Sequence, residues 1–497
     1  MKRRQFLQYS LGLGTLLAVS ITNTRAAFAA SLPADIVDFD GLTLSRAIHG
    51  REVSCHEVMQ AYLNHIALYN PVYNAIVSMV DDQSLLRQAQ STDEELAAGI
   101  DKGWMHGFPH AVKDLQAVAG IRFTSGSPMF ADRIAESDSL LAMRLRQAGV
   151  IFIGKTNTPE FGLGSQSYNQ VFGATGSAWN PELTSGGSSG GAASGLGTHM
   201  LPVADGSDMM GSLRNPGAFN NVIGFRPSVN VISGEESDPR ALSTRGPMGR
   251  NVRDTIALLG TLAARPVTDN YNPTELTGSR IAWLGDLDGY LATEDGVTDL
   301  CEASLQIVAE AGAEVESVLP KFNMSDLWQC WITLRHRGRA RGSRQYYDNP
   351  QMRSQLKPEL VWEIEQGLRL TDADESNARR IRADWYRELD RLFENHDFLV
   401  LPTARVFPFP KLQHWPTEIN GRTMDSYHRW MEIVISGSLG GLPVLNVPVG
   451  FDAQGRPMGM QIMGRYGDDQ RVLEFGLAYE LITDFLSQRP RLQSTSA

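Results

Sequence analysis

Helical segments alternate with short apolar segments along most of the chain, and this alternation restricts the possible folds more than any other feature. Residues 54–66 begin with the capping-box pattern S-x-x-E and continue with apolar residues at helical spacing. Residues 139–148 also fit a helix, and the apolar residues 150–153 that follow fit a buried strand. This order favours an α/β layered domain over a β-sandwich or a helix bundle.

The C-terminal half continues the alternation. Residues 280–318 fit a β-α-β unit, and the segment from about 320 to 395 fits mostly helix. A turn at 451–455 then predicts a hairpin. Because the sequence contains no internal repeat and no low-complexity linker, we expect residues 30–497 to form one large α/β domain.

A glycine- and serine-rich stretch, residues 184–227, is the candidate site. It contains GGSSGG at 186–191 and DGSDMMGSLRNP at 205–216, and the apolar residues 200–204 between them fit the end of a buried strand. Glycine permits positive φ and a close approach of the backbone to a bound molecule. A polar turn of this composition at a strand end suits a site at which backbone N–H groups bind a ligand.

These two motifs resemble those of the amidase signature family, and the likeness extends along the chain. HGFPHAVKD at 106–114 is similar to the family's lysine-bearing strand, and GKTN at 154–157 follows in the expected order. Residues 441–464 are similar to the family's closing hairpin. The resemblance covers most of the chain after about residue 45 and is weakest between about 230 and 395. It implies the amidase signature fold, in which a central mixed β-sheet is covered by helices.

The resemblance also implies a serine hydrolase with a Ser–cis-Ser–Lys triad. Ser212 would be the nucleophile, Ser188 on a cis peptide would be the bridging hydroxyl, and Lys113 would be the base. The backbone N–H groups expected to form the oxyanion hole belong to Met209, Met210, Gly211 and Ser212. The residues expected to hold the loop and the hydroxyls in place are Ser189, Asp208 and Arg214. The predicted reaction cleaves an amide to an acid and ammonia or an amine through an acyl-enzyme.

The chemistry requires Lys113 to be uncharged, because only the free amine accepts a proton. The ordinary pKa of lysine is about 10.4, so lowering it to near 7 corresponds to about 4 kcal/mol of differential solvation. Burial of the amine in a strand supplies a change of this kind, and Ala111 and Val112 provide an apolar setting. We therefore expect Lys113 to be buried.

One position departs from the family pattern and bears on the substrate. The family usually has Gly-Gly before its nucleophile, whereas this chain has Met210-Gly211. The sequence of the motif resembles more closely that of a branch that includes 6-aminohexanoate cyclic dimer hydrolases. The specificity pocket is expected to involve Met209, Met210 and residues 437–441 and 320–350. Aromatic residues in the last range favour an aryl or alkyl acyl group.

Composition and charge narrow the expected partners. The formal net charge is −11, which argues against a nucleic-acid partner. The basic run Arg335–Arg344 is predicted to be a surface loop or helix end, with a contact to an anionic substrate or partner as the alternative. The zinc motif HExxH does not occur in the sequence, and no metal or organic cofactor is expected. The expected ligand is a small-molecule amide, and a homodimer is left open.

The first 29 residues are predicted to be a twin-arginine signal peptide. RRQFL at 3–7 precedes a modestly apolar segment, and AFA at 27–29 fits a cleavage site. The apolar segment is too short and too rich in Gly, Ser and Thr to span a bilayer. We therefore expect interaction with the twin-arginine export machinery, a periplasmic or secreted location, and no stable membrane association after cleavage.

Two other functions remain as alternatives. The chain could be a catalytically inactive amide-binding protein, although all three triad positions are occupied by the expected residues. It could also be a component of a tRNA-dependent amidotransferase, which the predicted export disfavours because tRNA charging takes place in the cytoplasm.

Overall fold

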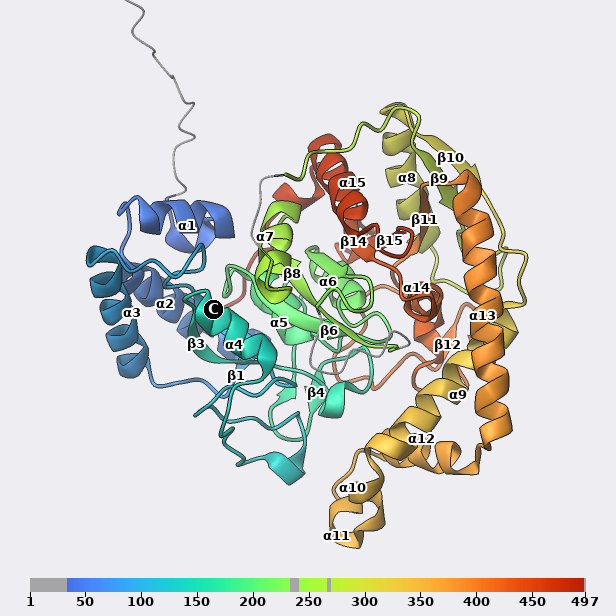
Figure 1. The fold of residues 1–497 in the computed structure, drawn as a ribbon, viewed down its shortest axis with the longest axis horizontal. Helices are drawn as coiled ribbons and strands as arrows, with labels where there is room; N and C mark the ends of the chain where they lie inside the picture. Colours follow the sequence, from blue (N-terminus) through green and yellow to red (C-terminus); the bar gives the residue numbers. More distant parts are fainter. Residues whose placement is uncertain (1–33, 233–240, 266–269, 496–497) are drawn as a thin grey trace, which may run out of the picture.

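The computed structural model describes residues 34–232, 241–265 and 270–495, and the predicted signal peptide at 1–29 lies outside these residues. The chain forms one α/β domain built on a mixed eight-stranded sheet, as predicted (Figure 1). Only the β10–β9 and β9–β11 pairs are parallel among its neighbours, and the other pairs are antiparallel. The strands, in spatial order, are β10 (Glu314–Ser317), β9 (Arg280–Trp283), β11 (Phe398–Pro402), β15 (Pro457–Met463), β14 (Val444–Phe451), β7 (Ile223–Arg226), β8 (Thr244–Gly249) and β6 (Ala204–Asp208).

A smaller sheet lies beside the β6 edge of the large one. It consists of β1 (Ile76–Val77), β3 (Ile151–Thr156) and β2 (Pro109–Lys113), in which β2 and β3 run parallel. Every residue of β2 and β3 is buried. Two further ladders of two strands each are β4 (Tyr168–Asn169) with β5 (Gly173–Ala174), and β12 (Glu418–Ile419) with β13 (Arg422–Thr423).

Helices surround both sheets. In Figure 1 the first four α-helices lie beside the small sheet, whereas α9, α12 and α13 lie on the opposite side of the molecule. The α-helices of the described residues are α1 (Gly41–His49), α2 (Cys55–Tyr73), α3 (Asp82–Ala97), α4 (Leu140–Gln147), α5 (Gly190–Gly197), α6 (Arg214–Asn220), α7 (Val252–Leu262), α8 (Val297–Glu310), α9 (Met324–Gly342), α10 (Arg344–Asp348), α11 (Pro350–Arg353), α12 (Pro358–Arg369), α13 (Asp372–Asn395), α14 (Ile435–Gly440) and α15 (Asp469–Ile482). The 3-10 helices are η1 (Ile36–Asp38), η2 (Pro128–Phe130), η3 (Glu160–Gly162), η4 (Arg429–Val434) and η5 (Phe485–Ser487).

Local sequence signals account for several of these boundaries. The capping box predicted at Ser54 is present: the Ser54 hydroxyl accepts from the Glu57 N–H at 3.1 Å, and the Glu57 carboxylate accepts from the Ser54 N–H at 2.8 Å. The predicted C-terminal hairpin is formed by β14 and β15, which pair antiparallel. The strand expected at 200–204 instead begins at Ala204 and continues to Asp208, so that polar residues occupy most of it.

The glycines of the candidate site are explained by close packing. A side chain at Gly191, near the start of α5, would meet the backbone N of Asn157 at 2.3 Å and the backbone O of Ala75 at 2.5 Å. Only glycine therefore lets α5 lie against the small sheet. This packing brings the turn before α5 next to the ends of β2 and β6.

Among the described residues, no helix is long and apolar enough to cross a membrane.

Candidate active site

Lys113 is the last residue of β2, and its amine is surrounded by three serine hydroxyls. The Nζ atom lies 2.8 Å from Ser188 Oγ, 2.8 Å from Ser189 Oγ and 3.2 Å from Ser207 Oγ. Ser188 and Ser189 lie in the turn before α5, and Ser207 lies on β6. The peptide bond between Gly187 and Ser188 is cis. The structure thus brings together two of the three residues predicted for the triad, and it places Ser189 in direct contact with the amine.

Burial determines the charge of this amine. Lys113 is 1% exposed, and desolvation lowers its pKa from 10.5 to about 7, although the carboxylates of Asp205 and Asp208 oppose the change. A substantial fraction of Lys113 is therefore uncharged near neutral pH, as its expected role requires. No arginine or lysine side chain of the described residues forms a hydrogen bond with it.

The hydrogen bonds around the amine indicate where its lone pair points. An uncharged amine has two N–H donors and one acceptor position, so one of three neighbouring hydroxyls must donate to it. The Ser189 hydroxyl lies 3.5 Å from the Ser207 carbonyl oxygen, to which it donates. The hydroxyls of Ser188 and Ser207 both have Lys113 as their only partner among the described residues, and Ser188 is the closer of the two, at 2.8 Å against 3.2 Å. Ser188 is therefore the best-placed proton donor to the amine.

Ser212 lies in the loop that leads from β6 to α6. It is 7% exposed, and its backbone carbonyl accepts from the Ser189 N–H at 3.2 Å. Within the described part of the chain, its hydroxyl makes no hydrogen bond, so the predicted contact between the hydroxyls of Ser212 and Ser188 is not formed in this structure. The loop is adjacent to the serine turn, but the Ser212 side chain remains free.

The predicted oxyanion hole needs one correction. The Gly211 N–H donates to the Asp208 carboxylate at 2.9 Å and is therefore occupied. The N–H groups of Met209, Met210 and Ser212 have no acceptor among the described residues. The loop thus offers three backbone donors rather than four. Gly211 has φ of +81°, which explains glycine at this position.

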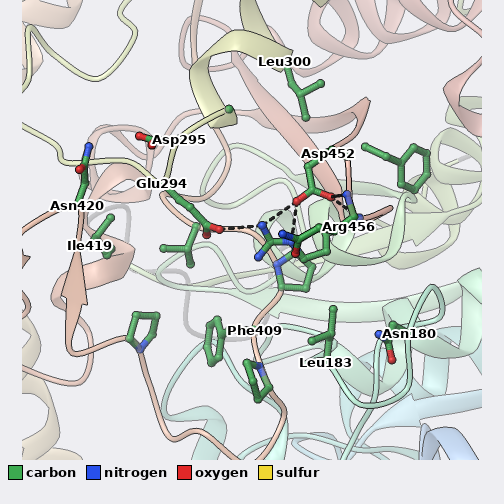
Figure 2. A pocket seen from close by; sticks show the side chains of 18 of the residues that line it. Asn180, Leu183, Glu294, Asp295, Leu300, Phe409, Ile419, Asn420, Asp452 and Arg456 are labelled. Carbon is green, nitrogen blue, oxygen red and sulfur yellow. Dashed lines mark hydrogen bonds and ion pairs between the residues drawn. The ribbon is translucent and has the colours of Figure 1, made fainter.

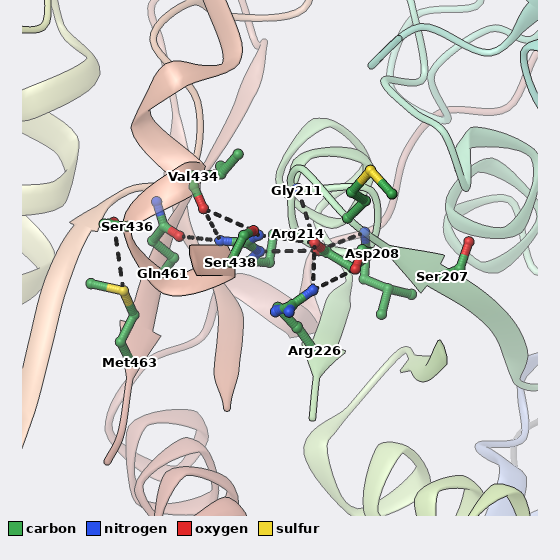
Figure 3. A network of polar contacts seen from close by, with 12 residues as sticks. Ser207, Asp208, Gly211, Arg214, Arg226, Val434, Ser436, Ser438, Gln461 and Met463 are labelled. Carbon is green, nitrogen blue, oxygen red and sulfur yellow. Dashed lines mark hydrogen bonds and ion pairs between the residues drawn. The ribbon is translucent and has the colours of Figure 1, made fainter. Parts of the chain in front are cut away.

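The loop is held by a buried ion cluster (Figure 3). Arg214 donates to both carboxylate oxygens of Asp208, at 3.0 and 2.9 Å, and Arg226 lies 3.4 Å from one of them. Burial alone would raise the pKa of the Asp208 carboxyl, but the two guanidinium groups lower it well below its usual range. Arg214 also donates to Gln461 at 2.7 Å and to Ser438 at 2.9 Å. These contacts fix the loop to β15 and α14.

Most of the basic run at 335–344 forms a helix end, one of the two structures predicted for it. Most of it belongs to the C-terminal half of α9, and its first residue, Arg335, is buried. Arg335 donates to the Glu363 carboxylate at 2.6 Å and to the Tyr427 hydroxyl at 2.9 Å, and it lies 3.3 Å from the Met209 sulfur. The expected surface position is wrong for Arg335, because its partner, Glu363, lies on another helix, α12.

His336, Glu363 and His428 form the only cluster of described residues whose spacing could hold a metal ion, with ligand atoms within 4.8 Å of one another. However, Arg335 and Arg339 already face the Glu363 carboxylate, at 2.6 and 3.6 Å. A divalent cation would have to be buried beside two guanidinium groups, which is electrostatically unfavourable. We therefore assign no metal to this cluster.

A pocket of about 650 Å³ is lined in part by Glu160, which lies in the loop that contains η3. Aromatic side chains form much of its wall, namely Tyr168, Trp362, His414, Trp415 and Tyr427. The same loop contacts the serine turn, since a side chain at Gly162 would lie 3.4 Å from Ser188 Oγ. Tyr427 is linked through Arg335 to Met209. An aromatic pocket is thus coupled to the candidate site by direct contacts.

A second cavity, of about 1160 Å³, is lined by none of the predicted site residues (Figure 2). Its guanidinium group, Arg456, is bound by Glu294 at 2.8 Å and by Asp452 at 2.7 Å. This basic group is already paired, and the described residues that line the cavity include no relay of hydroxyl and amine groups, so the cavity is a weaker candidate for catalysis.

Comparisons with known proteins show what the whole chain is similar to. Residues 57–473 match the model of the Amidase family. The chain is 30% identical over 471 residues to an acylamidase of Rhodococcus erythropolis, covering 90% of this chain and 96% of the relative. It is also 30% identical over 487 residues to a glutamyl-tRNA(Gln) amidotransferase subunit of Thermosynechococcus vestitus, covering 90% and 99%. The crystal structure of a bacterial aryl acylamidase superimposes with a TM-score of 0.81 at 24% identity, covering 91% and 99% of the two chains.

Proposed function

The chain belongs to the amidase signature family and is an amide hydrolase, and we propose that it acts through Ser212, Ser188 and Lys113. The observation that carries this proposal is the buried amine of Lys113, 2.8 Å from the Ser188 hydroxyl on the cis peptide. An amide needs an activated nucleophile, stabilisation of the oxyanion and a proton for the departing amine. In this proposal the Ser188–Lys113 relay activates Ser212 and later supplies the proton, and backbone N–H groups of the loop that contains Ser212 stabilise the oxyanion.

In the proposed mechanism, Lys113 takes the proton of Ser188 while Ser188 takes the proton of Ser212. Rotation of the small, unbonded Ser212 side chain brings its oxygen to Ser188, in line with the looser hydrogen bonds of unliganded active sites. The Ser212 oxygen then bonds to the amide carbon, and the carbonyl oxygen becomes an anion that backbone N–H groups of the loop stabilise. As the C–N bond breaks, the relay returns its proton to the departing nitrogen. Water then adds to the acyl-enzyme and releases the acid.

A panel of amides and matched esters tests this function. The mature protein is incubated with aryl, alkyl and peptide amides, and released ammonia or amine is measured. We expect hydrolysis by the native protein and none by Ser212→Ala or Lys113→Ala. Binding of amides without hydrolysis would instead indicate the inactive amide-binding protein, and a requirement for glutamyl-tRNA would indicate the amidotransferase.

The substrate is proposed to carry an aryl or alkyl group. This rests on the aromatic pocket of about 650 Å³ and on its link through Tyr427 and Arg335 to Met209. The exposed surface of this pocket is mostly apolar, and such a surface selects ligands by shape and burial, although Glu160, Lys357, Glu359 and Asp425 also line it. We expect Trp362→Ala to raise KM for aryl amides more than for acetamide, as measured by steady-state kinetics. An equal change in KM for both substrates would contradict the assignment of this pocket.

The pH dependence of hydrolysis follows from the lowered pKa of Lys113. The amine is a base only when it has lost its proton, so kcat/KM should rise with pH through about 7 and then level off. Stopped assays in buffers of constant ionic strength between pH 5 and 9 measure this rise. Activity that falls as the pH rises through 7 would contradict a lysine base.

Export through the twin-arginine system is a further part of the proposal. It is supported by the RRQFL and AFA patterns near the N-terminus. Replacing Arg3 and Arg4 by lysine is expected to leave an uncleaved precursor in the cytoplasm. Cell fractionation followed by mass spectrometry of the N-terminus measures this, and undiminished mature protein in the periplasm would contradict export by this route.

A further inference from the structure

The buried pair of His110 and Asp205 lies beside Lys113 and has no role in the proposed relay. His110 and Asp205 are both fully buried, and His110 Nε2 lies 3.1 Å from Asp205 Oδ1. The other oxygen of Asp205 accepts from the backbone N–H of Lys113 at 3.4 Å. A buried carboxylate is unfavourable unless it is paired, so the location of this one next to the catalytic amine calls for a physical reason.

The positions of Asp205 on β6 and of His110 on β2 explain why this pair lies beside Lys113. Asp205 and Ser207 lie two residues apart on β6 and therefore project to the same side of the strand. Ser207 contacts the Lys113 amine, and Asp205 contacts the Lys113 backbone. On β2, the pairing with β3 shifts between His110 and Ala111. Such irregularities redirect side chains, and here His110 faces Asp205 as well.

The proton of the pair is assigned from its hydrogen bonds. His110 Nδ1 has no partner among the described residues, whereas Nε2 faces a carboxylate oxygen. A protonated Nδ1 would be a buried donor without an acceptor, which is unfavourable. The arrangement therefore fits a neutral imidazole that donates through Nε2 and a carboxylate that keeps its negative charge.

The surrounding charges make Asp205 different from the other nearby carboxylate. Asp205 and Asp208 both act on the Lys113 amine, but Asp208 is bound by the guanidinium groups of Arg214 and Arg226. Asp205 has no ion pair with a lysine or arginine within the described ranges. The charges of Lys155 on β3 and Arg245 on β8 interact electrostatically with that of Asp205. The charge of Asp205 is thus the least compensated negative charge that faces the amine.

We propose that Asp205, held by His110, is a positioning residue for the base, and that its carboxylate stabilises the positive charge which Lys113 acquires on taking the Ser188 proton. The inference rests on the proposed function of Lys113. A buried carboxylate stabilises a cation that forms near it during proton transfer. The pair keeps the amine basic enough to accept the proton, while burial keeps the amine uncharged in the resting enzyme.

The test is the pH dependence of Ser212 labelling by an activated phosphonate, which does not require knowledge of the natural substrate. Asp205→Asn keeps the shape and one acceptor but removes the charge. We expect the rise in labelling rate to move to lower pH by about one unit or more. We also expect the maximum rate to fall about tenfold, because a weaker base takes the proton less readily.

Two controls separate this role from a structural one. Asp205→Glu keeps the charge, so its labelling rate should rise over nearly the same pH range as that of the native protein. Asp469→Asn removes another buried carboxylate, which accepts from the Ser228 N–H at 2.8 Å, and should not move the rise. If Asp205→Asn does not fold, Asp205→Ser is measured in the same way.

The outcomes distinguish the two proposals. A slower Asp205→Asn protein whose rise stays at the native pH would overturn the inference and leave Asp205 a structural role only. A native protein that is not labelled at Ser212 and hydrolyses no amide would overturn the proposed function itself.

Discussion

Replacing Ser212 with alanine is expected to lower kcat for amide hydrolysis by about a million-fold, the size of effect found when a catalytic serine is removed. The change removes the nucleophile and nothing else, because the Ser212 hydroxyl makes no hydrogen bond among the described residues. The free energy of unfolding should therefore stay close to that of the native protein. Product release and urea unfolding of both proteins measure the two effects.

Ser194→Ala is the matched control for this substitution. Ser194 is also buried, on α5, and its hydroxyl donates to the Gly176 carbonyl at 2.8 Å. Loss of this hydrogen bond should lower the free energy of unfolding by about 1 kcal/mol while kcat changes little. If instead Ser212→Ala retains amide hydrolysis and Ser194→Ala loses it, Ser212 is not the nucleophile.

Replacing Asp208 with asparagine is expected to lower the free energy of unfolding by about 3–5 kcal/mol, because it leaves buried guanidinium groups without their counter-ion. Asp208, Arg214 and Arg226 are all fully buried, and the carboxylate also accepts from the N–H groups of Gly211 and Leu213. The loop that carries Ser212 would lose its anchor, so activity should fall together with stability. Urea unfolding followed by circular dichroism measures the first effect.

Asp384→Asn provides the comparison for Asp208→Asn. Asp384 is ion-paired with Arg380 at 2.9 Å and with Arg387, but both arginine side chains are mostly exposed. Exposed pairs of this kind contribute about 0–1 kcal/mol. Equal losses of stability in the two variants would show that the cluster around Asp208 does not hold the fold together as described.

Local patterns predicted much of the fold. The capping box at Ser54 marks the start of α2, most of the apolar residues 150–153 lie in β3, and the C-terminal turn joins β14 to β15. These features depend on residues that are close in sequence, where propensity and hydrogen bonding act directly. The mixed sheet itself was anticipated through the resemblance, since strand order depends on contacts between distant residues.

Long-range contacts explain what the sequence did not disclose. Ser207 and Asp205 reach Lys113 only because β6, at the edge of the large sheet, lies against β2 of the small one. Arg335 looked like part of a solvated basic run, but it is buried against Glu363 on α12. Neither arrangement leaves a local spacing signal. The occupied N–H of Gly211 likewise follows from the geometry of one loop.

The central claim is that an uncharged Lys113 takes the proton of the nucleophile by way of Ser188. It is tested most directly by the rate at which an activated phosphonate labels Ser212 between pH 5 and 9, in the native protein and in Lys113→Met, which keeps the volume of the buried side chain. We expect a native rate that rises through about pH 7, and a variant rate lower by about 10²–10⁴-fold that lacks this rise. A Lys113→Met protein labelled as fast as the native one, with the same rise near pH 7, would contradict the claim.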